Sequence, residues 1–331
     1  MHRILLGLVL IAVFLPAAAI ADLIDDCRDS RRSQIRLKAC TSIIEGRGFD
    51  ANARAYAYQY RGDARNDAGA FRPAISDFSQ AIRLKPDNAQ AFAGRGRARF
   101  STGDFNSALS DFGDAIGIFP VEPEFYLLRA HVFLTQGNAE ASILDLTEAI
   151  RLNPQIPSAY NNRGLALRKK GNNAAALKDY DMAIALNPAF ALAYANRAAL
   201  REGTSERAAA IEDYQTALYL DPSIASARDA LRRLGQEGSA VRESEKRVRD
   251  GKALAERNCS ACHAIGTSLE SPNVKAPAFR EIRKRHTMIS LRGPITRAIA
   301  APHEEMPNFA ISDQQIDTII AYINSLVAPR P

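Results

Sequence analysis

Two thiols three positions apart, followed at once by an imidazole, carry the most specific chemistry in this chain: Cys259, Cys262 and His263. The two sulfurs of such a CxxCH segment can add to the two vinyl groups of a haem from one face of a turn, which is how c-type haem is attached. His263 would then lie beside the anchored ring and could give its Nε2 to the iron. The segment could also arise by chance, act as a dithiol or supply half of a zinc site, so the rest of the chain must decide.

The N-terminus has the layout of a secretory signal peptide. His2 and Arg3 precede an apolar run from Ile4 to Leu15, and Ala19-Ile20-Ala21 supplies the small-residue pattern of a cleavage site. We therefore expect residues 1–21 to be removed, leaving a periplasmic protein with no membrane span. A retained anchor is the alternative, although the apolar run is short for a span of about 20 residues.

Two amphipathic helices are expected to position the CxxCH segment. Val248–Arg257 leads directly into it, and Gly251 offers a point where another helix can approach closely. A second helix follows Ser312, which forms a capping box with Gln315. Its apolar residues recur at helical spacing, with one aromatic residue beside them: Ile316, Ile319, Ile320, Tyr322 and Ile323.

With these elements, residues 247–331 resemble a class I cytochrome c domain. The resemblance implies one covalently attached haem c, a C-terminal helix that crosses the first helix near a glycine and an aromatic residue, and a methionine as the sixth iron ligand. In this sequence these roles fall on Gly251, Cys259, Cys262, His263, Met306 and Tyr322. Pro277 resembles the family proline whose carbonyl accepts the Nδ1–H of the ligand histidine, a bond that would fix the orientation of the ring.

Met306 has three competitors as the sixth ligand, because His286, Met288 and His303 lie in the same interval. His286 belongs to a basic run expected on a solvated face, Met288 is a candidate core residue and His303 is expected to face water. Met306 is therefore favoured. A His/Met pair favours Fe(II), raises the reduction potential and leaves no open site for oxygen or peroxide. It predicts an electron carrier and not an enzyme.

The middle of the chain repeats every 34 residues. Four rows of residues keep this step: Pro86, Pro120, Pro154, Pro188 and Pro222; Ala81, Ala115, Ala149, Ala183 and Ala217; Asp77, Asp111, Asp145, Asp179 and Asp213; and Arg61, Arg95, Arg129, Arg163 and Arg197, each followed by Gly or Ala. Such a fixed period is a specific signal of stacked structural repeats.

This pattern resembles the tetratricopeptide repeat, in which small residues lie where two helices cross and a proline closes each unit. The resemblance implies an all-α fold: a superhelix with a concave groove for a protein or peptide, followed by the small cytochrome domain. Residues 55–235 would hold five repeats, beginning at residues 55, 89, 123, 157 and 191, and a capping helix from Ala225 to Leu234. Residues 236–246 are polar and are expected to form a linker, partly helical at most.

The repeated arginines and aspartates allow two interpretations. They could form a charged recognition stripe, but strict repetition better suits buried pairs that join the two helices of each hairpin. Recognition of a particular partner would need residues that differ between repeats. The ligand of the groove stays unidentified.

Two further cysteines lie in a degenerate hairpin at residues 22–54. In the repeat register, Cys27 aligns with Arg61, next to the small position of the first helix, and Cys40 aligns with Ala74, the small position of the second helix. Since these positions meet at the helix crossing, we expect a disulfide. Two unpaired cysteines that pack as small apolar residues are the alternative.

Three functions from different classes remain. The favoured one is an exported single-haem electron carrier whose repeats dock a redox partner protein. A periplasmic scaffold, assembly factor or redox sensor with a regulatory haem is the alternative, and a peroxidase is disfavoured because the chain has a single CxxCH segment. The net charge of +6 is modest, so no nucleic-acid partner is expected.

Overall fold

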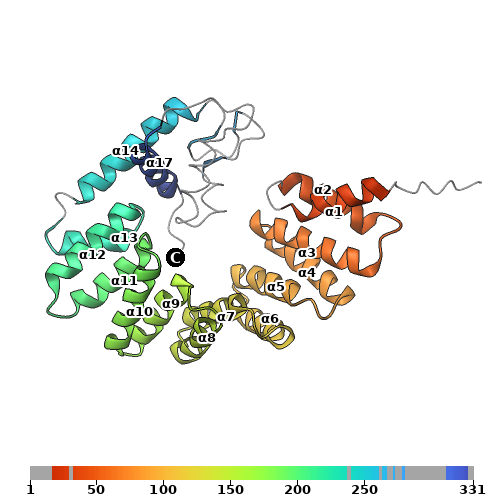
Figure 1. Cartoon of the computed structure of the whole chain (residues 1–331), viewed down its shortest axis with the longest axis horizontal. Coiled ribbons are helices and arrows are strands. Elements are labelled where there is room, and N and C mark those ends of the chain that lie inside the picture. Colours follow the sequence, from red (N-terminus) through yellow and green to blue (C-terminus); the bar gives the residue numbers. More distant parts are fainter. Residues whose placement is uncertain are drawn as a thin grey trace, which may run out of the picture. The chain divides into compact units, whose positions relative to one another are not determined.

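The computed structural model describes residues 17–29, 33–236, 240–260, 263–266, 271–272, 278–279 and 311–326. Within these ranges the chain is all-α, without a strand (Figure 1). The helices, labelled as in Figure 1, are α1 (Ala17–Arg28), α2 (Ser33–Glu45), α3 (Ala51–Asp67), α4 (Phe71–Leu84), α5 (Ala89–Ser101), α6 (Phe105–Ile118), α7 (Pro123–Thr135), α8 (Ala139–Leu152), α9 (Pro157–Lys169), α10 (Asn173–Leu186), α11 (Ala191–Glu202), α12 (Arg207–Leu220), α13 (Ala225–Arg233), α14 (Ala240–Asn258) and α17 (Asp313–Ser325).

The chain divides into two compact units, Met1–Val132 and Phe133–Pro331, with the boundary inside α7. None of the helices in the described ranges is both long enough and apolar enough to cross a membrane.

Within each unit the 34-residue step appears as helical hairpins. In the hairpins α5–α6, α7–α8 and α9–α10, the turn is closed by a glycine followed by a capping residue. Gly103 has φ +84° and Gly171 has φ +78°, a left-handed conformation that side chains with a Cβ rarely adopt. The next residue then caps the following helix: the side chain of Asp104 accepts from the backbone N–H of Ser107 at 3.2 Å. This local chemistry sets the boundary between α5 and α6 and between α9 and α10.

Small residues on the first helix of a hairpin face a large ring on the second. A Cβ placed on Gly62 would lie 2.9 Å from the Phe78 ring, and one on Gly164 would lie 2.7 Å from the Tyr180 ring. Both rings are fully buried. Glycine at positions 62 and 164 is therefore required by packing, because a larger side chain would push the two helices apart.

In four of the five repeats, the repeated arginine and aspartate form a partly buried ion pair between the two helices of the hairpin. The pairs and their N–O distances are Arg61–Asp77 (2.8 Å), Arg95–Asp111 (2.7 Å), Arg163–Asp179 (2.8 Å) and Arg197–Asp213 (2.7 Å). Each of these guanidinium groups also lies 5.4 to 5.7 Å from the centre of an aromatic ring three residues earlier in the chain. For these four pairs, the structural interpretation is confirmed.

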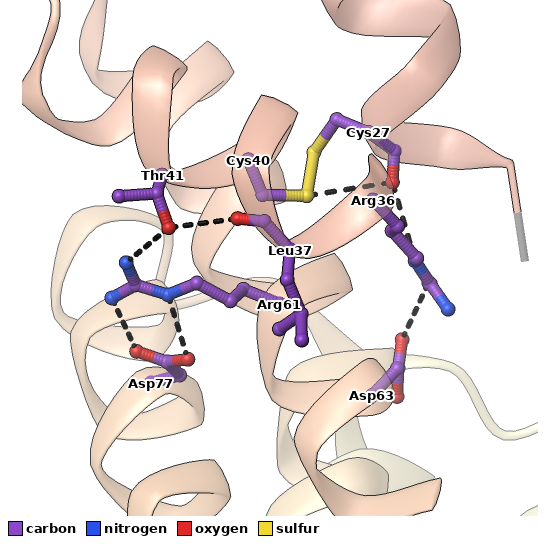
Figure 2. The surroundings of a disulfide bond; sticks show 8 residues. All are labelled: Cys27, Arg36, Leu37, Cys40, Thr41, Arg61, Asp63 and Asp77. Atoms are coloured by element: carbon purple, nitrogen blue, oxygen red, sulfur yellow. Dashed lines mark hydrogen bonds and ion pairs between the residues drawn. A yellow bond between two sulfur atoms is a disulfide. The ribbon is translucent and has the colours of Figure 1, made fainter. Parts of the chain in front are cut away.

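Cys27 and Cys40 form the expected disulfide, which joins α1 to α2 (Figure 2). Both half-cystines are buried, at 2% and 0% exposure. The contacts between this hairpin and α3 include the pair of Arg36 with Asp63 at 3.7 Å and the hydrogen bond that Arg61 donates to Thr41 Oγ1 at 3.0 Å. Helix α1 begins at Ala17, so its first five residues precede the expected cleavage point after Ala21.

The helix that leads into CxxCH begins earlier than the expected start at Val248. Helix α14 runs from Ala240 to Asn258 and so takes in residues 240–246 of the expected, partly helical linker, because this stretch is rich in the good helix formers Ala, Arg, Glu and Lys. Arg247 of α14 lies with its guanidinium 4.2 Å from the ring centre of Tyr219 on α12 and donates to the carbonyl of that residue. The last repeat helix and the helix leading into CxxCH are thus in direct contact.

Candidate functional site

The site is built where α14 crosses α17. A Cβ on Gly251 would lie 2.0 Å from the carbonyl oxygen of Thr318 and 2.9 Å from the Cβ of Tyr322. The nearest atom belongs to the backbone, so it cannot rotate away. Only glycine allows the two helices this close approach, and Gly251 and Tyr322 lie together as the sequence predicts.

An apolar core fills the space between these helices and the segments after CxxCH. Its buried members are Leu254, Ala255, Phe279, Ile319, Tyr322 and Ile323, with Cys259, Ile265 and Ile311 packed against them. The helical spacing of the isoleucines on α17 puts one face of that helix into this core. The capping box of Ser312 and Gln315 is present at its N-terminus, with Ser312 Oγ accepting from the Gln315 N–H at 3.3 Å.

Tyr322 connects α17 to the residues that follow CxxCH. Its hydroxyl donates to the carbonyl oxygen of Ile265 at 2.9 Å. Burial raises the pKa of this hydroxyl, and the nearby Glu256 carboxylate raises the pKa further, so the group stays a donor at neutral pH. Tyr322 therefore fixes the position of the chain two residues beyond His263.

Cys259 and His263 lie one turn apart at the end of α14. The Cys259 N–H donates to the Ala255 carbonyl at 2.8 Å, which continues the helix, and the His263 N–H donates to the Cys259 carbonyl at 2.9 Å. The turn keeps the thiol-bearing residue and the imidazole-bearing residue on one short stretch of backbone. This placement allows a single haem to be attached to the sulfur while the histidine coordinates its iron.

Further contacts hold the segment from His263 to Ile265. The Ala264 N–H donates to Ser271 Oγ, and the Phe279 N–H donates to the Ala264 carbonyl, both at 2.9 Å. The ring of Phe279 lies 5.6 Å from the ring of His263, centre to centre, with an interplanar angle of 50°. The segment is thus bonded to α17, to Ser271 and to Phe279.

Phe279 was not among the site residues predicted from the sequence. Two signals could have found it: it is the first aromatic residue after the CxxCH segment, and it stands two positions after Pro277. The acceptor of the Tyr322 hydroxyl was also not predicted.

The described part of this site fits a covalently bound haem. Cys259 is partly buried against apolar residues, and His263 is a nitrogen donor one turn away. A thiol and an imidazole in apolar surroundings are the donors that c-type haem uses. Cys262, Pro277 and Met306, and the competing ligands His286, Met288 and His303, lie outside the described residues, so their roles stay predictions.

The chain was compared with known families and proteins. Residues 52–123 and 127–191 match the family model of the tetratricopeptide repeat, and residues 248–327 match the family model of cytochrome c. A comparison with curated proteins gave no match.

Several solved structures are similar to the helical repeats. The anaphase-promoting complex hetero-tetramer Cut9–Hcn1 is 18% identical, with a TM-score of 0.54 over 68% of this chain and 44% of that chain. YrrB, described as a tetratricopeptide-repeat protein with an unusual peptide-binding site, is 20% identical, with a TM-score of 0.49 over 59% of this chain and 99% of that chain. MamA is 24% identical, with a TM-score of 0.45 over 48% of this chain and 93% of that chain. The likeness to Cut9–Hcn1 concerns the fold alone.

Proposed function

We propose that this chain, which combines tetratricopeptide repeats with a C-terminal cytochrome c domain, is an exported one-electron carrier with a single haem c bound through Cys259 and Cys262. The observation that carries the proposal is the crossing of α14 and α17 at Gly251, with Tyr322 bonded to Ile265 two residues after His263. When bound, haem supplies a one-electron Fe(III)/Fe(II) couple. The protein supplies attachment, burial and axial ligands.

His263 and Met306 are the proposed axial ligands, and the Pro277 carbonyl is the proposed acceptor for the Nδ1–H of His263. A thioether is a soft donor that stabilises Fe(II), so this pair raises the reduction potential relative to two histidines. Because both axial positions are then filled by the protein, oxygen and peroxide find no open position. We therefore expect electron transfer without catalytic turnover.

The periplasm is the proposed location. The signal-like residues 1–21 favour export, and the Cys27–Cys40 disulfide is typical of proteins in an oxidising compartment. Attachment of haem through CxxCH also needs thiols that are delivered to that compartment. After removal of the signal peptide no membrane span is expected.

The repeats are proposed to dock a protein partner. Since the repeated arginines are bonded to aspartates inside the hairpins, partner recognition falls to residues that differ between repeats. In residues 247–331, twelve Lys or Arg residues outnumber eight Asp or Glu residues, which favours an acidic redox partner at low salt.

Covalent attachment is tested with the Cys259→Ala/Cys262→Ala double variant. We expect the parent chain to carry haem through denaturing electrophoresis, detected by haem-dependent peroxidase staining, and the double variant to lose the stain. The Cys27→Ala/Cys40→Ala variant is the matched control and should keep it. A haem stain that persists in the Cys259→Ala/Cys262→Ala chain would show that the haem is attached elsewhere.

A further inference from the structure

Phe279 is the aromatic residue in contact with the proposed proximal ligand. Its side chain is 4% exposed, and its ring centre lies 5.6 Å from that of His263 with the planes tilted by 50°. This separation is within the range of attractive aromatic pairs. The contact joins two residues that are 16 positions apart in the sequence.

The position of the Phe279 ring is fixed from two sides. Its backbone N–H donates to the carbonyl of Ala264, the residue directly after His263, so the two segments are held in register. The ring itself belongs to the core that contains Leu254, Ile319 and Tyr322. A ring held by both backbone and core cannot follow a rotation of the imidazole, and instead limits it.

We propose that Phe279 is a positioning residue for His263, which limits rotation of the imidazole plane in addition to the proposed bond to Pro277 and covers the ring from water. This inference rests on the proposed function, since the plane of an axial ligand has consequences only when iron is bound. The plane of an axial imidazole determines how the unpaired electron of low-spin Fe(III) is distributed over the four haem methyl groups. Covering the ligand also lowers the local polarity, which favours the less charged Fe(II) state.

The test is proton NMR of the haem-loaded full chain. In the ferric state we expect Phe279→Ala to change the spread and the order of the hyperfine-shifted haem-methyl resonances and to lower the reduction potential. Phe279→Leu, which keeps apolar bulk without the ring, should change them less. Ile320→Ala removes apolar bulk from a buried position on α17 outside the core that holds the Phe279 ring, and is the control that should leave the haem-methyl pattern in place.

The wild-type chain gives a second, independent readout. In the reduced state, nuclear Overhauser contacts are expected between the ring protons of Phe279 and those of His263. Absence of these contacts, or a haem-methyl pattern in Phe279→Ala and Phe279→Leu identical to that of the parent, would overturn the inference while leaving the electron-carrier proposal standing. A wild-type chain without covalent haem would instead overturn both.

Discussion

Among single residues, Gly251 is required because α17 approaches its Cα closely. This steric requirement can be measured separately from the general effect of a glycine on helix stability. Replacing a glycine inside a helix by alanine normally stabilises a protein by roughly 0.5–1 kcal/mol, because the unfolded chain loses freedom. At Gly251 the added Cβ would meet the Thr318 carbonyl oxygen at 2.0 Å, so α14 and α17 must separate. At Gly113 in α6 the added Cβ would meet nothing within 4 Å.

We therefore predict opposite effects for two chemically identical substitutions. Gly251→Ala should lower the free energy of unfolding of the cytochrome domain by about 2 kcal/mol or more, since the close backbone contact is lost. Gly113→Ala should be neutral or stabilising by up to about 1 kcal/mol. Denaturant unfolding of the full chain, followed by haem absorbance and by circular dichroism, separates the two domains. Equal effects at both positions would contradict the crossing geometry.

Asp63 is expected to make the stability of the repeats depend on pH. Burial raises the pKa of its carboxyl to about 6, against the opposing influence of Arg97 and Arg36, whose guanidinium groups lie 3.3 and 3.7 Å away. Because the folded-state pKa lies above the unfolded value, the folded chain binds this proton more tightly. Stability from this group is therefore fully present below about pH 4 and is lost as the pH rises through 6.

The predicted consequence is a gain in stability on mild acidification. Between pH 7 and pH 4.5 the free energy of unfolding should rise by on the order of 1 kcal/mol from this group. Asp63→Asn should remove that rise, and Asp114→Asn, at an exposed position on α6, should keep it. Thermal unfolding measured across this pH range is sufficient. A slope that is the same in Asp63→Asn and in the parent would assign the pH dependence to other groups.

At the scale of elements, the N-terminal hairpin depends on its disulfide. Helices α1 and α2 bury a small core around Cys27, Ala39, Cys40 and Ile43, and two side-chain contacts attach α2 to α3. A hairpin with so little apolar area gains most from a crosslink, since the crosslink limits the unfolded chain.

We predict that Cys27→Ala/Cys40→Ala lowers the stability of this region by roughly 2–4 kcal/mol. Alanine is chosen because both positions are buried and a serine hydroxyl would add an unsatisfied polar group. Hydrogen exchange should become faster in α1 and α2 and stay unchanged in α9 to α12. Reducing the parent chain should have the same effect, and unchanged protection of α1 and α2 in both cases would refute a structural role for the disulfide.

The sequence predicts best those elements that follow the 34-residue repeat. The hairpin boundaries and the Arg–Asp pairs are visible as rows of residues with this spacing, and the same register places the two cysteines of the disulfide. The start of α14 was misplaced because a polar stretch was expected to be a linker, whereas its residue types favour helix and Arg247 binds α12 at Tyr219.

At the scale of the whole molecule, the CxxCH segment, Gly251 and Tyr322 could be placed in one site because their spacing is characteristic. The contact of Phe279 with His263 and the bond from Tyr322 to Ile265 could not be predicted, because each involves a residue of the non-helical segment after CxxCH, which follows no period. The ion pairs of Asp63 could not be predicted either, because they combine residues of three helices and do not repeat.

In the proposed function, one haem with histidine and methionine ligands makes this repeat protein an electron carrier. The decisive measurement is the absorbance spectrum of the full chain, purified from the periplasm and recorded oxidised and reduced, with Met306→Ala as the control. We predict one haem per chain, a low-spin spectrum in both states and the weak sulfur-to-iron charge-transfer band in the oxidised parent, with that band lost in Met306→Ala. A parent chain without haem, or one that is high-spin, lacks the band and binds carbon monoxide readily, would contradict the account.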